Sequence, residues 1–173
     1  MPAPFTVDTD RLILRPHRLD DFQDSLALWS DPVVTKYIGG RPSTKEEVWQ
    51  RLLRYAGHWA LLGYGFWTVR DRGSDRFLGE VGILDGKREL DPPFGDTPEV
   101  GWALAPSAHG KGYATEAVRA ALGWGAEHFG PKIRTVCMID PANAASIRVA
   151  EKVGYREYAR TAYKGVPTIL FER

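Results

Sequence analysis

Apolar side chains recur along the chain with the period of either a strand or a helix. Alternating or continuous apolar runs predict strands at 11–15, 66–70, 77–84, 99–105, 133–139, 155–163 and 168–171. Apolar residues at helical spacing predict helices at 19–29, 43–62, 113–129 and 143–153. Strands follow one another in the middle of the chain, and helices alternate with strands in its second half. This order predicts a mixed α/β domain and not a doubly wound parallel sheet.

Capping signals sharpen the ends of these helices. Ser43 followed by Glu46 is typical of a capping box that opens the second helix. Gly130 and Pro131 stop the third helix. The long segment 85–98 holds glycines, prolines and many charges, and is predicted to be a loop.

Length and composition narrow the class of protein. The 173 residues favour one domain spanning 1–173, and the 43% hydrophobic and 26% charged residues are ordinary for a globular protein. The net charge of +1, with no long basic run, argues against nucleic-acid binding as the main role. The single cysteine, Cys137, is expected to be a small buried side chain and permits no intramolecular disulfide.

Two further absences in the sequence bear on location. No apolar run approaches the roughly 18 residues of a membrane span. Residues 1–10 lack the basic and apolar regions of a signal peptide. We therefore expect a cytoplasmic protein without membrane contact.

The most informative segment runs from Leu104 to Ala117, with the sequence LAPSAHGKGYATEA. It places Gly110 and Gly112 between a predicted strand and a long helix. Glycines allow tight turns, and a helix start presents free N–H groups and a positive dipole end, so the segment can cradle a pyrophosphate. It is not a Walker loop, because Gly112 follows the lysine, and it is not a dinucleotide fingerprint, because Thr115 fills the third glycine position. The alternative to a pyrophosphate cradle is that the two glycines only end the strand and bind no ligand.

A second segment, Asp140 to Tyr155, lies about thirty positions later. Taken alone, Asn143 is best explained as a helix cap and Gly154 as the residue that ends the helix. The two segments together are distinctive. With the opening Thr9–Arg15 and the blocks 77–82 and 99–104, they resemble the GNAT superfamily of N-acetyltransferases over nearly the whole chain. The branch most similar is that of ribosomal-protein N-terminal alanine acetyltransferases.

The resemblance implies a fold and a ligand. The fold is a bent, mostly antiparallel sheet of six or seven strands, flanked by about four helices and splayed between 99–105 and 133–139. The pantetheine arm of acetyl-CoA would lie in that gap. The residues implied to bind it are Leu104, Ala105, His109, Gly110, Lys111, Gly112, Tyr113, Ala114, Thr115, Asn143 and Ser146.

The sequence departs from the superfamily pattern at two positions. His109 stands where Gln or Arg usually opens the loop, although a neutral imidazole still donates one hydrogen bond. Ala150 stands where many members carry a tyrosine that protonates the thiolate. Ser146, one turn earlier, is the natural substitute as the acid, with a role in bonding the helix backbone as its alternative.

The reaction that the resemblance implies is direct attack of an amine on the thioester, which requires a base. Glu99 is the first candidate, with a solvated strand end as its alternative. Glu80 on the adjacent strand is the second candidate, and a surface position is the simpler explanation for it. The four histidines show no metal-ligand spacing, so no metal is expected.

The acceptor stays open at this stage. Aromatic residues that fill the core or line a groove are Trp29, Tyr37, Trp59, Tyr64, Trp67 and Trp102, and acidic residues that attract an amine are Asp31, Asp85 and Asp91. A protein N-terminus, an amino acid, an aminoglycoside and a polyamine all fit. A homodimer is expected by analogy alone. A CoA-binding module without turnover and an ATP-binding enzyme are the rival hypotheses.

Overall fold

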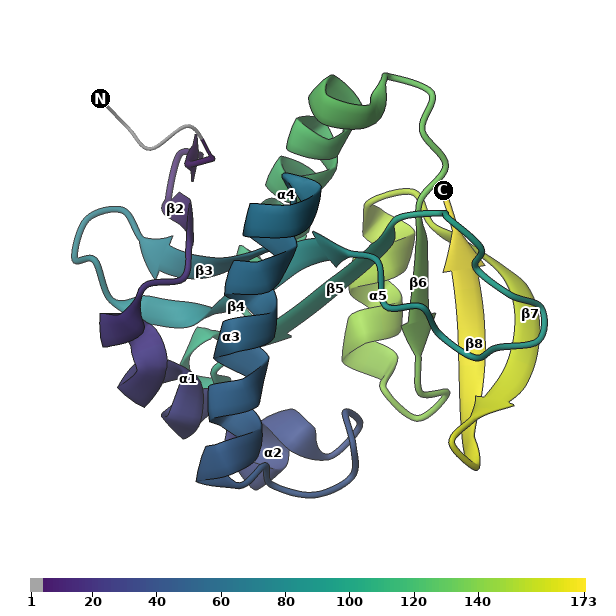
Figure 1. The fold of residues 1–173 in the computed structure, drawn as a ribbon, viewed down its shortest axis with the longest axis horizontal. Helices are drawn as coiled ribbons and strands as arrows, with labels where there is room; N and C mark the ends of the chain where they lie inside the picture. Colours follow the sequence, from purple (N-terminus) through teal and green to yellow (C-terminus); the bar gives the residue numbers. More distant parts are fainter. Residues whose placement is uncertain (1–4) are drawn as a thin grey trace.

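The computed structural model describes residues 5–173, which form one eight-stranded sheet with the order β1-β2-β3-β4-β5-β6-β8-β7 (Figure 1). The strands are β1 (Val7–Asp8), β2 (Leu12–Pro16), β3 (Phe66–Asp71), β4 (Phe77–Leu84), β5 (Glu99–Leu104), β6 (Val136–Ile139), β7 (Arg156–Tyr163) and β8 (Val166–Glu172). Every neighbouring pair is antiparallel except β5 and β6, which are parallel. The mostly antiparallel sheet is confirmed, and it has eight strands where six or seven were predicted. The two-residue strand β1 is too short to show a period.

Five α-helices and two 3₁₀ turns connect the strands. They are η1 (Leu19–Asp21), α1 (Phe22–Trp29), α2 (Pro32–Thr35), α3 (Lys45–Leu62), η2 (Pro106–Ala108), α4 (Tyr113–Phe129) and α5 (Ala144–Lys152). The helix absent from the prediction is α2, a single turn that Asp31 caps by accepting a hydrogen bond from the Val33 N–H.

The capping box of α3 lies one residue later than predicted. Thr44, not Ser43, is the cap, and it exchanges hydrogen bonds with Glu47, not Glu46. Both pairs have the spacing of the motif, so the sequence allows either. Glu47 also binds the guanidinium of Arg41, which fixes it in the capping position.

The sheet is splayed between β5 and β6, as predicted. All six residues of β5 pair with β4, whereas only Glu99 pairs with Val136 of β6. The predicted strand 133–139 therefore joins the sheet only from Val136 onward. Beyond that single pair the two strands separate, and their carboxyl ends stand on either side of a gap.

The two faces of the sheet are covered differently. The largest core packs α4 and α5 against one face, with Val118, Ala121 and Leu122 among its buried residues. Helices α1 and α3 cover the other face over β2–β5, and Figure 1 shows α3 crossing these strands. Further along the same face, the 85–98 loop covers β6 and β8 with Leu90 and Phe94. The gap thus opens between a helix-covered half and a loop-covered half of one face.

Candidate active site

The glycine loop forms the tight turn that its sequence predicts. Gly110 and Gly112 have φ angles of +72° and +78°, in the left-handed region that favours glycine. Gly112 is also the N-cap of α4, a helix of 17 residues whose first N–H groups have no partner within the helix. No atom lies within 4 Å of the position that a side chain on Gly110 would occupy. Open space in front of a helix start fits a pyrophosphate.

The N-terminal segment holds the glycine loop in place through side-chain contacts. Arg11 donates to the backbone oxygen of Lys111 at 2.9 Å and pairs with Glu116 in the first turn of α4. Thr9 donates to the same carboxylate at 2.7 Å. The motif Thr9–Arg15 is therefore linked to the loop by contacts across about one hundred residues, which no local sequence pattern reveals.

His109 has a role that the sequence did not suggest. Its Nε2 lies 2.8 Å from the carbonyl oxygen of Leu104, so this nitrogen must be the donor. In a neutral imidazole the remaining Nδ1 then carries a lone pair and cannot donate to a phosphate. His109 fastens the loop back onto the end of β5, and its predicted hydrogen bond to phosphate would require the protonated ring.

The edge of β5 offers backbone groups toward the gap. The Ala105 N–H donates to Leu78 of β4, and its carbonyl accepts from Ala108, so both of its backbone groups are used inside the protein. Because alternate residues of a strand direct their backbone groups to opposite neighbours, Trp102 and Leu104 direct theirs toward β6. Of the two residues predicted to pair with pantetheine, only Leu104 has an amide on the correct edge.

Asn143 and Ser146 lie at the start of α5, directly after β6. The Oδ1 atom of Asn143 caps the helix and accepts from the Ser146 N–H at 3.2 Å, so the simpler explanation of Asn143 describes its observed contact. Since β5 and β6 are parallel, the starts of α4 and α5 stand at the same edge of the sheet. The structure thus brings residues 104–115 and 143–146 to the two sides of one gap.

Glu99 is not a solvated strand end. It is 5% exposed, and the Arg88 guanidinium donates to both of its oxygens, at 2.8 and 2.9 Å. Arg88 comes from the 85–98 loop and also donates to the Tyr163 hydroxyl at 3.3 Å. Burial opposes the charge of Arg88, but the hydrogen bonds and charge of Glu99 hold the pKa of that guanidinium above its usual value.

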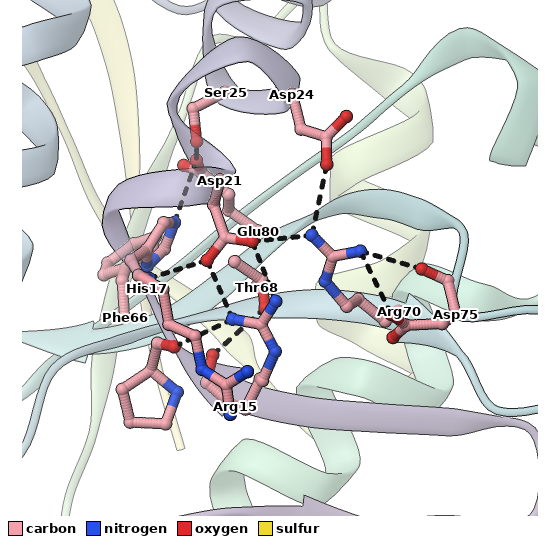
Figure 2. Close-up of polar contacts among 12 residues, drawn as sticks. Arg15, His17, Asp21, Asp24, Ser25, Phe66, Thr68, Arg70, Asp75 and Glu80 are labelled. Atoms are coloured by element: carbon pink, nitrogen blue, oxygen red, sulfur yellow. Dashed lines mark hydrogen bonds and ion pairs between the residues drawn. The ribbon is translucent and has the colours of Figure 1, made fainter.

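Glu80, expected at the surface, is fully buried, so that prediction is wrong. Figure 2 shows Glu80 beside His17, which directly follows β2, and Ser25 of α1. The Glu80 carboxylate lies 3.0 Å from His17 Nε2 and accepts hydrogen bonds from Ser25 at 2.8 Å and from the Trp29 indole at 2.9 Å. Burial alone would raise the pKa of Glu80, yet the charge and hydrogen bond of His17 and the two other donors lower it. No spacing rule could connect residues more than fifty positions apart.

A second buried carboxylate, Asp21, adjoins this cluster. Asp21 is 1% exposed and binds two guanidinium groups, those of Arg15 at 2.7 Å and Arg70 at 2.6 Å (Figure 2). Burial raises its pKa, but the hydrogen bonds from Arg15, the Arg18 backbone and Arg70 outweigh this and lower it to about 2. The ion pairs fasten the start of α1 to β2 and β3.

Several other predicted groups have partners within the protein. Asp31 caps α2, Asp85 pairs with Lys87, and Lys111 donates to the Ser107 carbonyl. Trp29 and Trp67 are buried in the core, and Trp59, Tyr64 and Trp102 pack against it. Within residues 5–173 no cluster of histidine, cysteine or acidic side chains is placed to hold a metal ion. No helix in this part of the chain is long and apolar enough to span a bilayer.

Comparisons with known proteins agree with this geometry. The family described as acetyltransferase (GNAT) domain matches residues 11–156. A Bacillus subtilis protein called YkkB, of uncharacterised activity, is 35% identical over 100% of this chain and 98% of its own length. A Bacillus licheniformis protein, called uncharacterised N-acetyltransferase p20, is 27% identical over 88% of this chain and 83% of its own length.

Solved structures share the fold. One from Bordetella pertussis, assigned to the GNAT-family acetyltransferases, is 32% identical, with a TM-score of 0.84 over 97% of this chain and 98% of that one. The family match covers both the glycine loop and the start of α5, which lie at the gap. This chain therefore belongs to the GNAT family and is an acetyltransferase.

Proposed function

We propose that this protein transfers the acetyl group of acetyl-CoA to a primary amine, on a protein N-terminus or a small molecule, by direct attack on the thioester. The observation that carries the proposal is the parting of β5 and β6 directly beside the glycine loop. A strand edge with free amides and an adjacent anion cradle suit an elongated ligand with a diphosphate at one end. Acetyl-CoA supplies the acetyl group as an activated thioester.

The residues implied by the family resemblance divide into two groups at this gap. The backbone of Gly110 to Thr115 would hold the diphosphate, and the Leu104 amide would pair with the pantetheine arm. Asn143 and Ser146 would contact that arm from α5. A spermidine N-acetyltransferase of Vibrio cholerae, 16% identical with a TM-score of 0.73, was solved with CoA and spermine, so this fold is able to hold CoA.

Glu99 is the proposed base. It stands at the single β5–β6 pair, on the face that α3 and the 85–98 loop cover. Arg88 donates to both of its oxygens, and each oxygen keeps a further lone pair that is able to accept from an incoming amine. As the nitrogen–carbon bond forms and the carbon–sulfur bond breaks, Glu99 takes a proton from the amine. Ser146 would return a proton to the leaving thiolate, and the Trp102 or Leu104 N–H would polarise the carbonyl.

The acceptor class is a separate part of the proposal. Two solved structures described as ribosomal-protein acetyltransferases are 19% and 16% identical to this chain. At that distance they support the shared fold, and an N-terminal alanine acceptor stays a prediction.

The alternative is a CoA-binding module that does not turn over. Ala150, at the position where many members place a tyrosine acid, is the residue that favours it. Release of free thiol from acetyl-CoA, measured with a panel of amines and peptides, decides between the two. Thiol release that depends on the amine supports the enzyme, and binding of acetyl-CoA without release across the panel supports the alternative.

A single substitution tests the cradle itself. Gly112→Asp places a negative side chain at the start of α4, in a left-handed conformation that aspartate tolerates only with strain. We expect acetyl-CoA to lose its stabilising effect on thermal unfolding of this variant. Binding equal to that of the wild type would remove the cradle from the proposal.

A further inference from the structure

Arg51 is a half-buried guanidinium without an acidic partner among residues 5–173. Its guanidinium carbon lies 3.8 Å above the Trp29 ring, and one of its terminal nitrogens donates weakly to the Tyr55 hydroxyl at 3.4 Å. Its Nε is sealed from solvent and has no hydrogen-bond partner within the described residues. A buried guanidinium N–H without a partner is uncommon. Because Nε is sealed, an acceptor would reach Arg51 through its terminal nitrogens, which bond Tyr55 only at the long distance of 3.4 Å.

The neighbouring acidic residues do not neutralise it. Glu47, one helical turn earlier, pairs with Arg41. Glu80 lies at the far edge of Trp29, but its oxygens already accept from Trp29 and Ser25 and contact His17. The Trp29 indole thus lies between Arg51 and Glu80, and the two charged groups form no hydrogen bond with each other.

Two series of packing contacts link Arg51 to the middle of β5. Trp29 beneath it packs in one cluster with Ala103. Tyr55 beside it stacks on Phe66, with ring centroids 4.6 Å apart and nearly parallel planes. Phe66 in turn covers Gly101, where an added side chain would stand 3.0 Å from its ring. Arg51 thus lies on the face of β5 that also carries Glu99, the proposed base.

The acidic side chains near this part of β5 already have partners within the described residues. Glu99 is paired with Arg88, and Glu80 accepts from Trp29 and Ser25. Asp31 and Asp85, the acidic groups expected to attract a cation, are used in a cap and an ion pair. An acceptor with several positive charges would have to break these pairs to gain an acidic partner, whereas an oxyanion would meet a planar guanidinium whose terminal nitrogens make only a long hydrogen bond to Tyr55.

We infer that Arg51 binds a carboxylate of the acceptor, so that the preferred substrates are amines that carry an acidic group: amino acids or peptides with an acidic residue near the N-terminus. This inference rests on the proposed acetyl transfer and adds the substrate class to it. Arg51 is an acceptor-binding residue, and Glu99 retains the proton transfer. Polyamines and aminoglycosides fall outside the class.

The test compares acceptors that differ only in the carboxylate. Glycine, β-alanine, 4-aminobutyrate and glutamate are each assayed for thiol release beside their carboxamides, with spermidine as the polycation and phosphoethanolamine as the phosphate analogue. We expect at least one carboxylate to exceed its carboxamide about tenfold or more in kcat/KM, because a charge-assisted hydrogen bond is typically worth about that factor or more. The best spacing reports how far Arg51 lies from the reacting amine.

Substitutions then test whether Arg51 causes the preference for carboxylates over carboxamides. Arg51→Gln should raise KM for the preferred carboxylate about 10- to 100-fold. KM for its carboxamide and for acetyl-CoA should be unchanged, and Arg51→Lys should recover part of the loss. Arg54→Gln, the same change on an exposed arginine of the same helix, is the matched control and should change little. Thermal unfolding of each variant verifies that it is folded.

Three outcomes would overturn the inference. These are a preference for spermidine or for the carboxamides, a preference for the phosphate over every carboxylate, and an equal loss on carboxylate and carboxamide in Arg51→Gln. If no amine yields thiol, the proposed function fails on its own. Binding still decides the inference in that case: thermal shifts of the CoA-loaded protein with the same carboxylates should be present in the wild type and absent in Arg51→Gln.

Discussion

Glu80 on β4 and Glu99 on β5 stand on the same face of the sheet, and both are buried, but different kinds of partner hold them. Glu80 is enclosed by His17, which directly follows β2, and by the Ser25 hydroxyl and the Trp29 indole of α1. Glu99 is held by one arginine from the 85–98 loop. A loop can move without unfolding the protein, whereas a packed helix cannot. The comparison leads us to assign an architectural role to Glu80 and to keep Glu99 as the proposed base.

The largest effect is expected when the carboxylate of Glu99, the proposed base, is removed. Glu99→Gln keeps the shape but removes the base, and general-base catalysis typically contributes about 10²- to 10⁴-fold. We expect a fall of that size in kcat, measured as thiol release at saturating acetyl-CoA, with cofactor binding retained. A variant that keeps wild-type turnover would show that Glu99 has only a structural pairing with Arg88.

The opposite result is expected at Glu80. Glu80→Gln replaces one of the two buried acceptor oxygens by an NH2 group, which then faces either the Trp29 N–H or the Ser25 and His17 side of the cluster, so we expect a loss of about 3 kcal/mol in the free energy of unfolding. Urea unfolding measures this loss. Turnover per folded molecule should stay within a few-fold of the wild type. A stable Glu80→Gln variant with turnover reduced a hundredfold would reverse the roles of the two carboxylates.

A fall in pH tests the same comparison, because Asp21, like Glu80, is a buried carboxylate with a structural role. Its pKa is about 2 in the folded protein, against roughly 3.9 in an unfolded chain. Its contribution to stability, about 2 kcal/mol, is therefore complete above pH 5 and is lost as the pH falls from about 4 to 2. Unfolding free energies measured across that range should fall less steeply in Asp21→Asn than in the wild type. Equal slopes would mean that Asp21 does not carry the acid sensitivity.

The smallest effect on stability is expected at Gly101, which lies against the ring of Phe66. A side chain on Gly101 would meet the far end of the Phe66 ring at 3.0 Å, so Gly101→Ala should cost about 1 kcal/mol in unfolding free energy. A side chain on Gly82 would collide with the Phe66 backbone, which cannot swing aside, so Gly82→Ala should cost more. Thermal melts of the pair measure the difference. Equal losses would show that Phe66 does not pack as described.

The sequence predicted those parts of the fold that local patterns determine. The bounds of α4 and β4 match the prediction, and the glycine loop adopts the expected turn. Two-residue β1 and four-residue α2 are too short to display a period, and were not predicted. The α3 cap was displaced by one residue because Arg41, outside the motif, selects Glu47.

The candidate site was predictable in its backbone but not in its side-chain contacts. Glycines and a helix start are encoded within a few adjacent residues. By contrast, the partners of Glu80 and Glu99 come from segments brought together only by folding: His17 is 63 positions from Glu80, and Tyr163 is 75 positions from Arg88. For the same reason, no sequence pattern indicates that Arg51 lacks an acidic partner within residues 5–173.

The lone residue pair that joins β5 to β6 also has a mechanical consequence. Forces within a sheet pass through its ladder of backbone hydrogen bonds. The block β6–β8–β7 shares one such residue pair with the rest of the sheet, and its other links are the α4–α5 contact and the packing of the 85–98 loop. An elongated molecule seated between the strands would supply the missing ladder. Occupancy of the gap would then make two flexibly joined blocks behave as one rigid sheet.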